Sequence, residues 1–325
     1  MRALSNPVVC PLCASAQTRE IADVRDSYHY LPGTWRLFHC GACKAGFLAD
    51  APDEDHIGAY YPASAYYTHA APRPDNRVMA AIYAYHYGRR RDFGAALLHA
   101  LLGRFVNMFP RARSQGTTRL LDFGCGNGAL MQRYAAYGFE CEGFDVDENA
   151  VANIRDRGFA VYSGDWRALP ARQYDVIILN QVLEHLHRPI EVLRFLRERL
   201  APGGQLIVSV PNRDCLDYDL LLDSWSSFQA PTHLFHYRLE SLRPLLRQAG
   251  FRIEEVRYAS PLGTLKPGYI RHNVRNLVRM EGQSVRTRLR GLLFAASSLL
   301  ALVPGISARK RIRITACCVS DAART

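Results

Sequence analysis

The 325-residue sequence contains no apolar run that approaches the ~20 residues needed to span a bilayer. Its first nine residues also lack the apolar core of a secretion signal. A membrane-spanning protein and an exported one are therefore both disfavoured. We expect a cytoplasmic protein whose nine cysteines stay reduced. With 48% apolar and 22% charged residues, the chain has the composition of a globular protein with a sizeable core.

Acidic residues are scarce in one late segment. Between Thr264 and Arg313, eleven lysines and arginines stand against the single acid Glu281, a balance of +10 out of the chain's formal +11. A basic surface spread over the whole protein is thus not indicated. The segment contains an apolar run over 291–303, too short to cross a bilayer. It is either a helix packed on the domain with its arginines in solvent, or a peripheral membrane contact through 270–313 at the inner membrane face.

Four of the nine cysteines form two Cys-x-x-Cys pairs, Cys10/Cys13 and Cys40/Cys43, with 26 residues between them. Each pair makes a tight turn that offers two thiolates to one ion, and two such turns complete a tetrahedral set of sulfur ligands. The alternatives are unrelated buried cysteines or a thioredoxin-like redox pair. Because protein fills all four ligand positions, we predict a structural Zn²⁺ in an N-terminal module over residues 1–60.

The stretch Leu-Leu-Asp-Phe-Gly-Cys-Gly-Asn-Gly-Ala-Leu over residues 120–130 predicts a buried strand, a glycine turn and then a helix. Glycines let the backbone approach a ligand closely, and N–H groups at the start of the helix point into the same space. Asp145 follows 19 residues after Gly126, at the end of the next predicted strand. In doubly wound folds a carboxylate at that distance accepts hydrogen bonds from ribose hydroxyls. A nucleoside-bearing cofactor is therefore the first inference.

The same glycine spacing fits a dinucleotide-binding loop, which would make the protein an NAD-dependent oxidoreductase. Asp122 distinguishes the two cofactors because it stands two residues before the first glycine. An anionic side chain there repels a pyrophosphate and attracts the ammonium group of S-adenosylmethionine. The residues therefore favour S-adenosylmethionine as the cofactor.

From Thr118 onward, predicted strands and helices alternate, which implies a parallel sheet with helices on both faces. The expected strands are 119–123, 140–145, 159–162, 174–179, 204–210, 251–258 and 311–320, the last of them antiparallel to its neighbours. The expected helices are 128–137, 147–157, 189–200 and 238–249. We expect residues 61–115 to form a linker and helical segment, and residues 116–325 the main domain, with an insertion at 260–310.

The pattern Asp-x-Gly-x-Gly-x-Gly beginning at Asp122 resembles motif I of the class I S-adenosylmethionine-dependent methyltransferases. Two further stretches match this family in the right order, namely (D/N)xxxEHL at Asn180 to Leu186, and Pro-Gly-Gly at 202–204. The zinc knuckles make the chain similar to a bacterial subgroup of glycan and natural-product biosynthesis. The resemblance implies a Rossmann-like, doubly wound α/β sheet of seven strands with a zinc-ribbon-like module. It also implies methylation of a small molecule or glycan, with oxygen as the favoured acceptor atom.

Within this fold, ligand contacts are expected at the carboxyl ends of the strands. Asp165 would accept from the adenine amino group or act as an ordinary helix N-cap, while Trp166 offers a stacking face. Of two histidines, His233 is the candidate base or substrate ligand, and His185 is favoured for a structural or cofactor-side role. The predicted cofactor-binding residues are Asp122, Gly124, Gly126, Gly128, Asp145, Val146, Asp165, Trp166 and Asn180.

Two other functions stay open. An RNA methyltransferase would use the zinc module and the +10 segment to hold its substrate. However, Gln-Val-Leu follows Asn180 in place of the Pro-Pro-Tyr typical of nucleobase N-methyltransferases. A non-catalytic cofactor-binding protein is the second alternative. It would have no physical need for all three of Asp122, Asp145 and Asp165.

Overall fold

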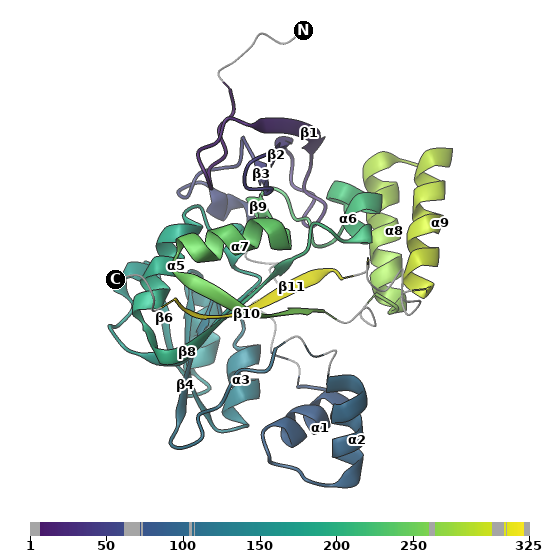
Figure 1. Ribbon diagram of the computed structural model, residues 1–325. Helices are drawn as coiled ribbons and strands as arrows, with labels where there is room; N and C mark the ends of the chain where they lie inside the picture. Colours follow the sequence, from purple (N-terminus) through teal and green to yellow (C-terminus); the bar gives the residue numbers. More distant parts are fainter. Residues whose placement is uncertain are drawn as a thin grey trace.

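The computed structural model describes residues 7–61, 72, 74–103, 106, 108–259, 264–300, 309 and 311–321. In this part of the chain, a seven-stranded sheet with flanking helices forms the centre of the molecule (Figure 1). A four-stranded sheet from the N-terminal region lies above it in this view. One helical pair, α1–α2, lies below the large sheet, and another, α8–α9, lies to its right.

The large sheet has the strand order β10-β11-β8-β7-β4-β5-β6. Strands β8, β7, β4, β5 and β6 are parallel, whereas β11 is antiparallel to both β8 and β10. This confirms the predicted seven-stranded doubly wound sheet with an antiparallel last strand. The order of the strands reverses at β4, because β5 and β6 lie on one side of it and β7 and β8 on the other. The carboxyl ends of β4, β5 and β7 therefore form the edge at which such folds bind ligands. The strands are β4 (Thr118–Phe123), β5 (Phe139–Asp145), β6 (Ala160–Ser163), β7 (Tyr174–Asn180), β8 (Leu200–Pro211), β10 (Phe251–Tyr258) and β11 (Arg313–Ser320).

Helices cover both faces of this sheet because successive strand residues point to opposite sides. Leu121 and Ile177 belong to the core beneath α5 and α7, whereas Leu120 and Ile178 belong to the core beneath α3 and α4. All four side chains are fully buried, as expected for central parallel strands. The covering helices are α3 (Ala129–Ala135), α4 (Glu148–Arg155), α5 (Pro189–Glu198) and α7 (Leu239–Gln248).

The small sheet is antiparallel, with the order β1-β2-β3-β9. Its first three strands are β1 (Thr18–Val24), β2 (Trp35–Cys40) and β3 (Gly46–Leu48), and the short helix η1 (Ile57–Tyr60) follows them. The fourth strand, β9 (Phe235–His236), lies between β8 and β10 in the sequence and pairs with Gly46 and Phe47. A two-residue strand carries no period in the sequence, so this pairing was not predicted. It holds the segment around His233 against the N-terminal module.

Two helical pairs extend from the sheets. Helices α1 (Arg77–His86) and α2 (Phe93–Leu102) begin at the N-caps Asn76 and Asp92, whose side chains accept backbone N–H bonds. The second pair is α8 (Pro267–Glu281) and α9 (Val285–Leu299), which packs near α6 (Leu216–Leu221). Among the described residues, no helix combines the length and the apolar character required to cross a membrane. The remaining short helices are η4 (Trp166–Ala168), η5 (Leu183–His185) and η6 (Leu222–Ser224).

Candidate active site

The glycine turn between β4 and α3 has a backbone that only glycine adopts easily. Gly124, Gly126 and Gly128 have φ angles of +79°, +51° and +74°, all in the left-handed region. A Cβ atom on Gly124 would stand 2.3 Å from Cγ2 of Val182, which is closer than any real contact. The N–H groups of Gly124 and Cys125 both donate to the Phe144 carbonyl, at 2.7 and 2.9 Å, and tie the turn to β5. The turn is thus fixed in shape and free of side chains on its glycine positions.

Asp122 lies at the end of β4 beneath this turn and is 1% exposed. Its Oδ1 has no hydrogen-bond partner among the described residues. Burial, helped by the nearby Asp145 carboxylate and opposed by Arg133, raises the pKa of Asp122 to about 8. A buried carboxyl group without a partner is costly, and a cationic ligand group would satisfy it. The ammonium group of S-adenosylmethionine fits that requirement, and a pyrophosphate does not.

Asp145 ends β5, next to the turn, and its carboxylate is already engaged at two points. Its Oδ2 accepts from the N–H of Gly126 at 2.8 Å, and its Oδ1 accepts from the N–H of Asp147 at 3.1 Å. Burial raises the pKa of Asp145, while these two backbone bonds act in the opposite direction. A carboxylate offers about four acceptor positions, so two remain for hydroxyl groups of a ribose. Val146 follows and is 74% exposed.

Asp165 and Trp166 lie at the start of η4, after β6. The Asp165 carboxylate accepts from the N–H of Arg167 at 3.0 Å, so the residue caps this short helix. That backbone bond is the largest cause of the lowered pKa of Asp165. Trp166 packs edge-on against Phe195, with ring centroids 4.8 Å apart, and the Arg167 guanidinium lies 4.2 Å above its ring. The Asp165 carboxylate keeps further acceptor positions after capping the helix. A contact between Asp165 and the adenine amino group stays a prediction.

The two candidate histidines lie together. The rings of His185 and His233 are 4.5 Å apart at their centroids and nearly perpendicular. Nδ1 of His185 is 2.8 Å from the Thr232 carbonyl oxygen and 2.9 Å from the Tyr61 hydroxyl. Burial lowers the pKa of His185 to about 4 and lowers that of His233 well below its ordinary value. Both imidazoles are therefore neutral at neutral pH.

His233, the predicted base or substrate ligand, was expected at the open carboxyl edge of the sheet, but its side chain is 3% exposed. The bond from the Leu234 N–H to the Glu184 carbonyl, 2.9 Å long, draws the segment inward against η5. Glu184 lies in the same place, fully buried, and neither carboxylate oxygen has a partner among the described residues. Burial raises its pKa to about 8. The sequence analysis assigned Glu184 no role beyond its place in the EHL motif. Asn180, a predicted cofactor-binding residue at the end of β7, also has a buried Oδ1 without a partner among the described residues.

The four N-terminal cysteines converge as their spacing predicts. The Cys10 and Cys43 sulfurs are 3.6 Å apart, and so are those of Cys13 and Cys40. All four sulfurs lie within 4.8 Å of one another. Ligands of a tetrahedral ion with Zn–S bonds of about 2.3 Å stand about 3.8 Å apart, so the cluster has the dimensions of a Cys₄ zinc site.

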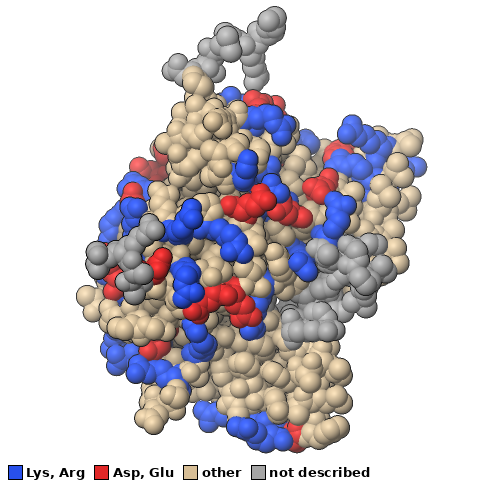
Figure 2. Space-filling model, in the orientation of Figure 1, with Lys and Arg blue, Asp and Glu red and all other residues tan. Residues whose placement is uncertain are grey.

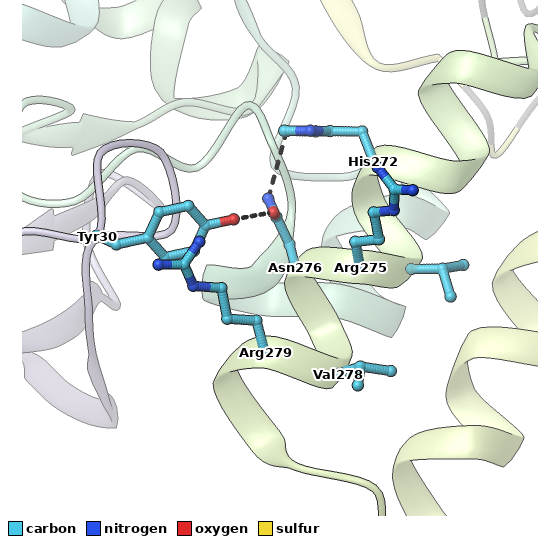
Figure 3. A pocket seen from close by; sticks show the side chains of 7 residues that line it. Tyr30, His272, Arg275, Asn276, Val278 and Arg279 are labelled. Carbon is cyan, nitrogen blue, oxygen red and sulfur yellow. Dashed lines mark hydrogen bonds between the residues drawn. The ribbon is translucent and has the colours of Figure 1, made fainter. Parts of the chain in front are cut away.

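The α8–α9 hairpin carries most of the late basic segment. Arg271, Arg275 and Arg279 recur every four residues along α8, and none of them forms an ion pair with a described residue. A surface hollow of about 520 Å³ lies between α8 and Tyr30 of the N-terminal module (Figure 3). In this hollow the Tyr30 hydroxyl donates to the Asn276 side chain, and the Arg279 guanidinium lies 3.5 Å above the Tyr30 ring. The hollow is thus lined by arginines and hydrogen-bonding side chains together with Val274 and Val278.

Comparisons with known proteins agree with this fold. A family model described as a methyltransferase domain matches residues 87–256, which is just over half of the chain. Two relatives, both named ubiquinone biosynthesis O-methyltransferase, come from Ruegeria pomeroyi and Bordetella pertussis. The first is 32% identical over 174 residues, covering 46% of this chain and 66% of that protein. The second is 34% identical over 114 residues, covering 32% of this chain and 46% of that protein.

Among solved structures, the cyclopropane synthase MmaA2 from Mycobacterium tuberculosis is 14% identical, with a TM-score of 0.46. The match covers 83% of this chain and 99% of that one. The chain spans between 46% and 66% of the length of the two curated relatives. The match to the family model, which extends from before α2 into β10, places the chain in the methyltransferase-domain family. It carries a class I S-adenosylmethionine-dependent methyltransferase domain, as motif I and the seven-stranded sheet predict.

Proposed function

We propose that the protein transfers the methyl group of S-adenosylmethionine to an oxygen atom of a small-molecule or glycan acceptor. The observation that carries this proposal is the buried Asp122 carboxyl, whose Oδ1 has no hydrogen-bond partner among the described residues and which lies beneath a glycine turn beside Asp145. The names of the two relatives support oxygen as the acceptor atom and a small molecule as the acceptor.

In this proposal each side chain at the sheet edge has a distinct task. Asp122 holds the ammonium group of the cofactor, and Asp145 holds the ribose hydroxyls with its two remaining acceptor positions. Asp165, Trp166 and Asn180 surround the adenine of the cofactor. Bound S-adenosylmethionine supplies an electrophilic methyl group on a sulfonium. The chain's own contribution is to position the acceptor oxygen beside His185 and His233, which is worth several kcal/mol.

We also propose that the four cysteines hold one Zn²⁺ that stabilises the N-terminal module and takes no part in the reaction. Its support is the sulfur geometry and the lack of any open ligand position in a Cys₄ set. In this division of the chain, residues 1–60 form the zinc module, 61–115 the linker and helical segment, and 116–325 the catalytic domain. Strand β9 connects the first and the last of these.

Methyl transfer is tested with the full-length, zinc-loaded protein and S-adenosylmethionine labelled at the methyl group. Purified protein is incubated in separate reactions with RNA and with small-molecule extracts that include phenols and glycan precursors. We expect label in an organic product, with release of stoichiometric S-adenosylhomocysteine. Label in RNA alone would mean that the acceptor is a nucleic acid and not a small molecule. If the protein binds no S-adenosylhomocysteine, the proposed methyl transfer is wrong.

The α9 helix supports a second proposal, that the protein docks on an anionic membrane surface. Its exposed apolar residues are spaced so that, at 3.6 residues per turn, they lie on one face of the helix. They are Val285, Leu289, Leu292, Leu293 and Leu299, between 50% and 85% exposed. Arg286 and Arg288 flank this apolar face, and Figure 2 shows basic side chains at the upper end of the hairpin with an uncharged outer edge over α9. Lipid phosphates would bind the arginines while the leucines enter the interface.

Sedimentation with lipid vesicles tests this docking. We expect the protein to bind vesicles rich in phosphatidylglycerol, less strongly at high salt, and not to bind neutral vesicles. Leu292→Asp should abolish binding without lowering the free energy of unfolding, because Leu292 is 68% exposed. Leu97→Asp, on the exposed face of α2, is the matched control and should bind as the wild type does. If the wild type stays in solution even at low salt, α9 is an ordinary surface helix.

A further inference from the structure

A second cluster of metal-ligating side chains lies apart from the four cysteines. Glu184, His185 and His233 each offer one ligand atom, and these three atoms lie within 4.8 Å of one another. In the part of the chain that the structure describes, this cluster and the cysteines are the groups of three or more ligand-type side chains that converge in this way. The cluster combines two imidazoles with one carboxylate.

Each histidine has one ring nitrogen committed to a backbone group and the other available. Nδ1 of His185 donates to the Thr232 carbonyl at 2.8 Å, so its Nε2 carries the free lone pair. The His233 ring is hydrogen bonded to the backbone of Ser227, and its Nδ1 has no partner among the described residues. Metal-binding histidines typically donate one N–H to a carbonyl or carboxylate, which fixes the tautomer and orients the other nitrogen toward the metal. Both histidines meet this condition.

Glu184 supplies the charge that such a site requires. Its side chain is fully buried, and both oxygens lack a hydrogen-bond partner among the described residues. Removing a carboxylate from water without compensation costs several kcal/mol, and a bound divalent cation removes that cost. A bound cation would therefore account both for the unpartnered Glu184 oxygens and for the unpartnered Nδ1 of His233.

The segments that carry these ligands are locked to each other and to the cofactor loop. The Leu234 N–H donates to the Glu184 carbonyl, and the His185 ring bonds to Thr232, so η5 and the chain before β9 are joined twice. On the other side, Val182 packs against Gly124 of the glycine turn. Since His185 is only half-buried, the cluster also reaches the surface. A metal here would lie next to the methyl-donor pocket and remain accessible to an acceptor.

We infer that Glu184, His185 and His233 bind one divalent transition-metal ion, such as Mn²⁺, Fe²⁺, Co²⁺ or Zn²⁺, with open positions for oxygen ligands. Its role rests on the proposed methyl transfer: the ion binds the hydroxyl group of the acceptor and lowers its pKa. The hydroxyl proton goes to solvent, the oxygen forms a bond to the methyl carbon, and the S–C bond breaks to leave S-adenosylhomocysteine. The acceptors favoured by such a site carry two adjacent oxygens that chelate the ion.

The metal site is tested first without reference to activity. Protein that contains one Zn²⁺ per chain, so that only the Cys₄ site is filled, is titrated with Mn²⁺, and free Mn²⁺ is followed by electron paramagnetic resonance. We expect one Mn²⁺ per chain, with affinity at least tenfold lower in both Glu184→Gln and His233→Ala. His187→Ala, two residues beyond His185 with its ring bonded to the Pro52 carbonyl, is the control and should bind as the wild type does.

Absence of Mn²⁺ and Co²⁺ binding to the folded wild type, or binding that neither variant weakens, would overturn the inference. Thermal unfolding and zinc content establish that each variant is folded, and His185→Gln, at the half-buried ligand, replaces any variant that is not. The role in catalysis is measured separately. Chelation that removes the ion should stop methyl transfer while S-adenosylhomocysteine still binds. A protein that binds Mn²⁺ but methylates no acceptor would keep the metal site and refute the proposed function.

Discussion

Replacing Asp122 by asparagine is expected to weaken S-adenosylhomocysteine binding about 10- to 100-fold at about pH 8.5. The change preserves the shape of a side chain that is 1% exposed, and it removes only the charge that meets the ligand ammonium group. A charge-assisted hydrogen bond of this type is worth about 1.5–3 kcal/mol. Isothermal titration calorimetry of the two proteins measures the difference. Equal affinities would mean that Asp122 does not face the ligand.

The same carboxyl makes cofactor binding depend on pH. Because burial holds the pKa of Asp122 at about 8, the free protein carries the neutral form below that pH and must lose a proton to pair with a cation. The affinity of the wild type should therefore rise about tenfold per pH unit from about pH 6 and level off above about 8. Asp122→Asn should show no such slope. Asp165→Asn, an exposed carboxylate whose pKa is lowered, is the control and should keep it.

Replacing Cys40 by serine is expected to remove the zinc and to lower the free energy of unfolding by at least about 3 kcal/mol. Cys40 is fully buried at the end of β2, and its sulfur also accepts the N–H of Cys43 at 3.4 Å. A structural metal contributes directly to folding, since the unfolded chain holds no preformed site. Metal analysis and urea unfolding measure the two effects. After exchange with Co²⁺, the thiolate-to-cobalt absorption band reports the sulfur site alone.

Cys317→Ser provides the matched control for this experiment. Cys317 is 4% exposed on β11, outside the cysteine cluster, so the substitution buries a hydroxyl group but leaves the four ligands intact. It should retain the cobalt–thiolate band and lose less stability than Cys40→Ser. If Cys40→Ser retained a full complement of metal, the four sulfurs would not be its ligands.

The alternating part of the fold follows closely from sequence pattern. Strand β10 was expected at 251–258 and occurs there, and β4 differs from its expected bounds by one residue. β4 is a short apolar run that is buried over most of its length, whereas β10 begins with alternating apolar and charged residues, as expected for a strand at the edge of the sheet. The cysteine cluster was predictable for a similar reason, since two short turns of fixed spacing determine where four sulfurs lie.

Tertiary contacts between distant segments were not predictable from pattern. Strand β9 has only two residues, so its pairing with β3 depends on the surrounding packing. That pairing, together with the Leu234–Glu184 bond, buries His233 beside His185 instead of leaving it over an open mouth. Glu184 was overlooked because a buried acid in an apolar stretch gives no sign in the sequence that its oxygens lack partners. Its significance depends on which groups the fold brings near it.

A crystal structure of the zinc-loaded protein with S-adenosylhomocysteine tests the central claim most directly. We expect the ligand at the carboxyl ends of β4 and β5, with its ammonium group about 3 Å from the Asp122 carboxylate and its ribose hydroxyls on Asp145. A ligand bound elsewhere, or one seated at this edge without contact to either carboxylate, would contradict the proposed methyl-donor site.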